Sequence, residues 1–112
     1  LRWLEQHLPG SGVGLRSVTS ERLGLSIAGP ASRAILQTLT DADLSSEGFP
    51  FLAIRELEID LVPALVGRIT YTGDLGFEIW VEAACLRRLF TSLEGRRSSL
   101  TRMGTEVIAM FF

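Results

Sequence analysis

The chain has 112 residues, which is enough for one compact domain that buries about two-thirds of its unfolded surface and too few for a two-domain enzyme. Its 11 basic residues, all arginine, stand against 13 acids, and the net charge of −2 argues against a nucleic-acid partner. Charges interrupt each apolar stretch before it reaches the ~20 residues that cross a bilayer, so no membrane partner is predicted. The single cysteine, Cys85, cannot form an internal disulfide, which suits a reducing compartment and predicts a cytoplasmic location.

The first 30 residues predict a short helix followed by two strands. Leu1, Leu4 and Leu8 fall at helical spacing, and a Pro-Gly pair closes that segment. Apolar residues then alternate with smaller ones over 13–18 and 23–27. The simplest interpretation of these two strands is a hairpin.

A second helix is predicted after Gly29-Pro30, over residues 31–40, with Ser32 helping to cap it. Residues 41–50 are rich in turn formers. Apolar positions recur over residues 51–59 but are interrupted by the charged pair at 55 and 56. This pattern predicts one strand with a bulge or bend at that pair.

Residues 61–71 and 77–81 predict adjacent antiparallel strands, because they bracket a short segment with two glycines, Gly73 and Gly76. An apolar stripe with i, i+3, i+4 and i+7 spacing then predicts a helix over residues 84–94. The fold class expected from this order is α+β, with a mainly antiparallel sheet and helices packed on one face.

Several candidate sites have an ordinary structural explanation. The glycine-rich run at 10–14 follows a helix, whereas phosphate-binding loops open one. His7 has no second metal ligand at suitable spacing, so no metal site is predicted. Cys85 suits a small buried thiol, and the arginine pairs at 87–88 and 96–97 suit solvated surface.

The hairpin at residues 68–80 combines a phenol, Tyr71, with a carboxylate on the following strand, Glu78. Strand alternation places Glu78 on the same face as Trp80 and opposite Phe77. A carboxylate beside aromatic surface suits a flat, polar heterocycle. The alternative from pattern alone is a surface hairpin with alternating polarity.

This run, RITYTGDLGFEIW, resembles the hairpin of the folate-binding aminomethyltransferase family, which includes the glycine-cleavage T-protein and the C-terminal regions of dimethylglycine and sarcosine dehydrogenases. Asp74 stands where the family usually has Glu. Residues 27–33, with Gly-Pro-Ala-Ser-Arg, and residues 49–51 resemble two further family segments in the same order. Their spacing is closer to the dehydrogenase branch.

The resemblance implies that Tyr71 and Glu78 contact the pterin ring of tetrahydrofolate, and that Arg68 supports the hairpin by pairing with a neighbouring acid. It implies no catalytic residue here, because the family's key aspartate lies upstream of the matching region. We therefore expect residues 1–94 to be part of a folate-binding domain and residues 95–112 to be a divergent or truncated tail. The isolated chain is expected to be inactive and to self-associate through its apolar end.

The function implied by the resemblance is transfer of a one-carbon unit from an amine such as dimethylglycine, sarcosine or glycine, forming 5,10-methylene-tetrahydrofolate. FAD would be bound by a separate domain of a longer parent protein in the dehydrogenase branch. A non-catalytic regulatory or scaffolding module of the same fold is the alternative, and the mitochondrial matrix is the alternative location. The family's iron–sulfur-assembly branch is not supported, because its motif needs Lys and this chain has none.

Overall fold

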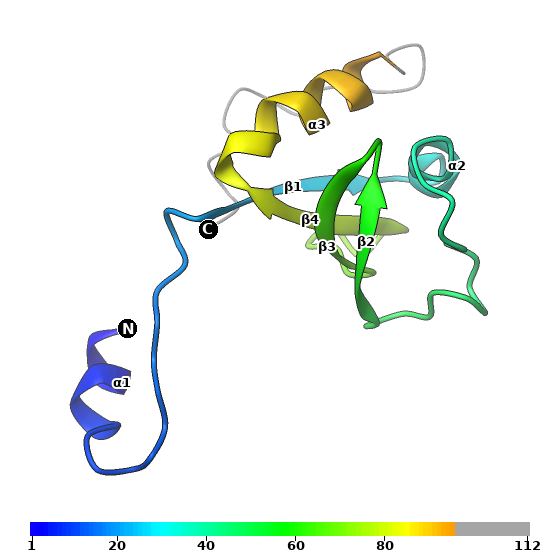
Figure 1. Cartoon of the computed structure of the whole chain (residues 1–112). Coiled ribbons are helices and arrows are strands. Elements are labelled where there is room, and N and C mark those ends of the chain that lie inside the picture. The colour runs from blue at the N-terminus through cyan, green and yellow to red at the C-terminus, as the bar shows by residue number, and fades with distance from the viewer. Residues whose placement is uncertain (96–112) are drawn as a thin grey trace.

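The computed structural model describes residues 1–95, which form a four-stranded antiparallel sheet with helices before, between and after its strands (Figure 1). The spatial strand order is β1-β4-β3-β2. In chain order the elements are α1 (Arg2–His7), β1 (Arg22–Ala28), α2 (Ser32–Gln37), β2 (Ile54–Ile59), β3 (Val62–Gly67), β4 (Gly76–Glu82), the 3-10 turn η1 (Ala83–Cys85) and α3 (Leu86–Glu94).

Strand β4 lies between β1 and β3, and its alternation decides which face of the sheet is buried. Phe77, Ile79 and Val81 are fully buried. Ile79 pairs with Leu25 on one side and with Val66 on the other, and both partners are buried. Because cross-strand partners share a face, all three strands direct their apolar side chains to the same side.

Helices α2 and α3 contribute to the core on that buried side. Leu36 of α2 and Leu89 of α3 are fully buried in the same apolar cluster as the strand residues. Phe49, from the loop after α2, stacks on Phe77 with ring centroids 5.9 Å apart. Each such side chain contributes roughly 1.5–3 kcal/mol when it leaves water. The predicted α+β class, with helices on one face of an antiparallel sheet, is confirmed.

The tight turn between β2 and β3 joins the sheet to α3 and to the residues that follow α2. Asp60 and Leu61 connect the paired residues Ile59 and Val62, and both have positive φ, at 48° and 62°. The Asp60 carbonyl accepts a hydrogen bond from Arg88 at 3.1 Å, and its carboxylate accepts one from the Ser92 hydroxyl. The Asp60 N–H donates to Leu39 at 2.7 Å. Asp therefore suits this position, since it tolerates left-handed backbone and can bond to α3.

Two predictions about β1 and α2 were wrong. Residues 13–18 are not a strand, and β1 pairs with β4 instead of with them. The reason is burial, because β4 offers β1 a row of core residues while Val13 and Leu15 stay exposed. Ser32 does not cap α2; the N-cap residue is Ala31, and the Ser32 hydroxyl donates to the Leu75 carbonyl at 3.1 Å. The helix is also shorter than the predicted range 31–40.

The remaining elements follow the predicted pattern with shifted ends. Strand β2 begins at Ile54 rather than at 51, and its register with β3 is continuous at Arg55 and Glu56, so the predicted bulge is absent from this strand pair. Helix α3 is confirmed, with η1 in front of it. Helix α1 is also confirmed and lies well away from the sheet (Figure 1). The predicted tail, residues 95–112, and the self-association expected of it lie outside the described residues, apart from Gly95, which is the C-cap of α3.

We expect Asp60→Ala to lower the free energy of unfolding by about 2 kcal/mol. The substitution removes the hydrogen bond from Ser92 and places a less suitable residue at positive φ, and each effect costs about 1 kcal/mol. Urea unfolding followed by circular dichroism measures the change. Glu58→Ala, an exposed position on β2, is the control and should change the value by less than about 0.5 kcal/mol. Equal values for the two variants would show that the turn does not fix α3 to the sheet.

Candidate functional site

The hairpin that the sequence singled out is formed by β3 and β4, which are antiparallel neighbours as predicted. Strand β3 ends at Gly67, opposite Glu78, and residues 68–75 form the connecting loop. Tyr71 therefore lies in the loop and not on a strand, with 91% of its surface exposed. Among residues 1–95, no hydrogen bond joins the Tyr71 side chain to Glu78, so the structure places the two predicted site residues at neighbouring but separate positions.

The loop is fixed to the junction between β1 and α2 through one carbonyl. The Leu75 carbonyl accepts hydrogen bonds from the Gly29 N–H at 2.7 Å and from the Ser32 hydroxyl at 3.1 Å. Within the loop, the Thr70 hydroxyl donates to the Asp74 carbonyl at 2.7 Å. Two segments that are far apart in the sequence, 27–33 and 68–80, thus meet at the base of this loop.

A third segment reaches the same loop through Arg68. Its guanidinium donates to the Phe49 carbonyl at 2.9 Å, and its backbone N–H donates to the Ala53 carbonyl at 2.9 Å. The prediction that Arg68 pairs with a neighbouring acid was wrong, because the guanidinium bonds to a backbone carbonyl instead. Its predicted supporting role agrees with this geometry, since the bond holds residues 49–53 against the start of the loop.

Gly76 begins β4 at a point where no side chain fits. An added Cβ would lie 2.2 Å from the Thr70 methyl carbon and 2.4 Å from the Ile27 carbonyl oxygen. This close approach of three segments explains the glycine better than turn geometry does, because the positive φ of the loop belongs to Gly73 instead. This crowding could not be predicted from local sequence, because it depends on the pairing of Gly76 with β1, about fifty positions away.

Glu78 lies on the face of the sheet opposite the core. It is half-buried, and its cross-strand neighbours are Ser26 on β1 and Gly67 on β3. Among the residues that the structure describes, its carboxylate makes no hydrogen bond or ion pair. The predicted sharing of a face with Trp80 is confirmed by the alternating burial of β4. Glu78 is thus a partly desolvated acceptor with free lone pairs.

The Trp80 ring extends across β3 toward β2. An added Cβ at Gly67 would lie 3.3 Å from a Trp80 ring carbon and 3.6 Å from a side-chain carbon of Ile54. The missing side chain at 67 therefore leaves room for the indole beside Glu78. A groove of about 860 Å³ continues along this open face, with Ile54, Leu65 and Trp80 among its lining residues. Tyr71 and Glu78 are not among them.

The other polar candidates have structural partners. His7 bonds through Nδ1 to the Trp3 carbonyl at 2.8 Å, and its ring stacks on Trp3. Cys85 is partly buried against the core. The pKa of Asp43 is lowered by hydrogen bonds from the Ser45 backbone N–H and hydroxyl, which belong to the loop after α2.

Within residues 1–95, no group of three or more His, Cys, Asp or Glu side chains is placed to hold a metal ion. No helix in that range is long and apolar enough to cross a bilayer.

The chain is similar in sequence to a protein family and to several named proteins. The family model described as "GCVT N-terminal domain" matches residues 1–110. The chain is 37% identical to the mitochondrial dimethylglycine dehydrogenase of Rattus norvegicus over 111 residues, which is 94% of this chain and 13% of that protein. It is 38% identical to the aminomethyltransferase of Geobacillus kaustophilus over 104 residues, which is 91% of this chain and 28% of that protein. The chain therefore spans less than a third of either relative.

A solved structure shares the fold. The heterotetrameric sarcosine oxidase from Corynebacterium sp. U-96, in complex with pyrrole 2-carboxylate, matches with a TM-score of 0.72 at 22% identity. The match covers 88% of this chain and 51% of that chain. The arrangement of strands and helices described above is thus found in a larger protein.

Gly76→Ala should lower the free energy of unfolding by about 2–3 kcal/mol, because the new methyl group overlaps backbone and side-chain atoms that are fixed by the sheet. Gly14→Ala is the control, since nothing lies within 4 Å of the added atom there and its φ is not in the left-handed range. Its effect should be below about 0.5 kcal/mol. Thermal unfolding of both variants measures the difference. A stable Gly76→Ala variant would mean that the loop is not held at this distance from β1.

Proposed function

Because this chain belongs to the family of the GCVT N-terminal domain, we propose that the hairpin of β3 and β4 binds the pterin ring of tetrahydrofolate, with Glu78 as the main polar contact and Tyr71 as a second one. The observation that carries the proposal is the half-buried Glu78 carboxylate, which has no partner among residues 1–95. A carboxylate without a protein partner can accept hydrogen bonds from a ligand in place of water.

The pterin ring suits this acceptor. It offers a 2-amino group and an adjacent N3–H, and one carboxylate can accept both hydrogen bonds at once. Each bond to a charged group contributes about 1.5–3 kcal/mol. The loop that carries Tyr71 is anchored at Leu75, Thr70 and Arg68, so the phenol is presented from a fixed backbone. The exposed Tyr71 ring is available to a ligand that lies at the mouth of the hairpin.

We further propose that the activity belongs to a longer polypeptide. One-carbon transfer from an amine to tetrahydrofolate, giving 5,10-methylene-tetrahydrofolate, fits relatives named aminomethyltransferase and dimethylglycine dehydrogenase. The amine site and any FAD domain would lie outside this chain, and residues 1–94 would supply part of the folate-binding domain. The rat relative is mitochondrial by name, and a mitochondrial matrix location is proposed beside the cytoplasmic one.

Titration of tetrahydrofolate onto the longer polypeptide tests binding, and formation of 5,10-methylene-tetrahydrofolate from each candidate amine tests transfer. Binding together with turnover supports the proposal. Binding without turnover with dimethylglycine, sarcosine or an aminomethyl donor would favour the regulatory or scaffolding alternative. Absence of binding would contradict the proposal and would also favour that alternative.

We expect Glu78→Gln in the longer polypeptide to weaken tetrahydrofolate binding by about 2–4 kcal/mol, or roughly thirty- to a thousand-fold. The amide removes the charge and sets one NH2 donor against a donor of the ring. Calorimetric titration measures the loss. Glu82→Gln is the matched control, because Glu82 is exposed at the far end of the same strand, opposite Arg22. Equal and small losses for the two variants would remove Glu78 from the site.

A further inference from the structure

Residues 1–20 lie outside the sheet, and α1 stands well away from it (Figure 1). All of them are exposed except Leu8, which is half-buried, and α1 has no buried residue. Exposed apolar side chains gather here, with exposed fractions of 61% for Val13, 43% for Leu15 and 40% for Val18. A concentration of apolar surface in one segment is typical of an interaction site.

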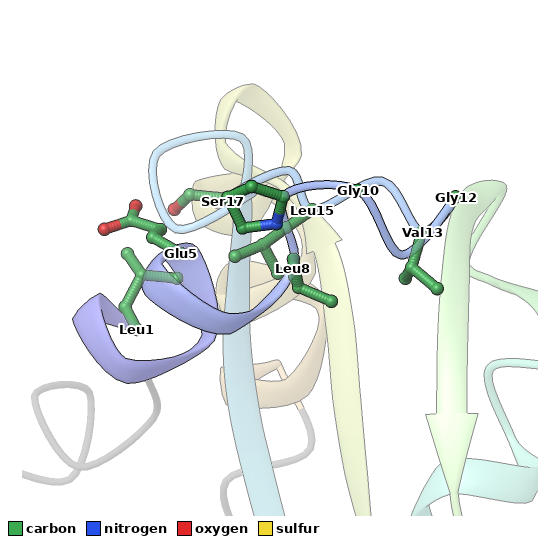
Figure 2. A pocket seen from close by; sticks show the side chains of 9 residues that line it. Leu1, Glu5, Leu8, Gly10, Gly12, Val13, Leu15 and Ser17 are labelled. Carbon is green, nitrogen blue, oxygen red and sulfur yellow. The ribbon is translucent and has the colours of Figure 1, made fainter.

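Residues 13–18 have the alternation of a β-strand, although they are paired with no strand among residues 1–95. Figure 2 shows the hollow between this segment and α1, which is lined by Val13, Leu15 and Ser17 and by Leu1, Glu5 and Leu8 of the helical side. The intervening residues Arg16 and Val18 line the groove on the open face of the sheet instead. Side chains that alternate between two sides with a period of two are characteristic of extended, strand-forming chain.

Most of the backbone of this segment is also unpaired. Among its carbonyls, only that of Val18 accepts backbone hydrogen bonds within residues 1–95, from the N–H groups of Glu21 at 2.9 Å and Arg22 at 3.0 Å. The N–H groups of residues 14–18 donate to no other residue among those that the structure describes. The Val13 N–H donates only to the Ser11 hydroxyl, at 3.2 Å. A row of free N–H and C=O groups is the template onto which another strand adds.

We propose that residues 13–18 are one strand of a second, small sheet, and that a strand from the same polypeptide, outside these 112 residues, pairs with them. The chain spans 13% of the rat relative and 28% of the Geobacillus kaustophilus relative, so their lengths leave ample chain to supply the partner. The added strand is the layer on which α1 packs. This proposal is independent of folate binding.

Helix α1 gives a second reason to expect that another strand covers this segment. It has six residues, and an isolated helix shorter than about 12 residues is marginal in water without tertiary packing. Its N-cap residue Leu1 is 67% exposed and Leu4 is 42% exposed, so the helix has no such packing among residues 1–95. If α1 packed on one face of a sheet of at least two strands, Leu1 and Leu4 would be buried together with Val13 and Leu15.

Amide hydrogen exchange on the full-length polypeptide tests the proposal. We expect the amides of residues 14–18 to exchange about a hundredfold or more slowly than in the 112-residue chain, because strand pairing protects them. Equally fast exchange in both would overturn the proposal. A second copy would be the partner if these amides already exchanged slowly in the 112-residue chain, if they exchanged more slowly at higher protein concentration, and if light scattering showed a dimer. That result would also overturn the proposal.

A pair of variants tests the assignment of faces. In the full-length polypeptide, Leu15→Ala should reduce the protection of residues 14–18 about tenfold or more, because Leu15 faces the hollow under α1. Arg16→Ala should reduce it by less than about threefold, since Arg16 faces the other side and pairs with the exposed Glu21. The protection of the Ile79 amide, in β4, against hydrogen exchange reports whether the main sheet stays folded. Equal losses for the two variants would contradict the strand alternation.

Discussion

The pairing of β4 along both of its edges is the constraint on which the rest of the molecule depends. Phe77, Ile79 and Val81 are fully buried because β1 and β3 flank them with apolar partners and because α2 and α3 cover them. A central strand with this alternation has one face committed to the core. Its other face is then left to Glu78 and Trp80, so the position of the candidate site follows from the packing of the core.

The loop before β4 is where long-range contacts are concentrated. The Leu75 carbonyl bonds to Gly29 and Ser32, and Arg68 bonds to the Phe49 carbonyl. Each contact closes a long stretch of chain, which has an entropic cost that the few hydrogen bonds do not offset alone. Burial of the core on the same side of the sheet offsets it. The three segments that resemble the aminomethyltransferase family are therefore near one another because one strand organises them.

Local periodicity was enough to predict the alternation of β4, the antiparallel pairing of β3 with β4 and helix α3, because each depends on residues close in the sequence. It failed where a distant partner decides the outcome. The pairing of β1 with β4, the Ser32 hydroxyl on Leu75 and the carbonyl partner of Arg68 all depend on how the sheet closes. Tyr71 was placed on a strand because the apolar pattern continues beyond Gly67, although the backbone pairing stops there.

The two faces of β4 differ in what a substitution on each of them changes. A change at Glu78 or Trp80 alters the open face and leaves no cavity among Phe77, Ile79 and Val81, whereas a change in those three residues disturbs the packing that positions both. The fold is accordingly recognisable in a sarcosine oxidase at 22% identity with a TM-score of 0.72. Residues of the open face can thus be substituted with little effect on the packing, because every second residue of this strand points away from the core.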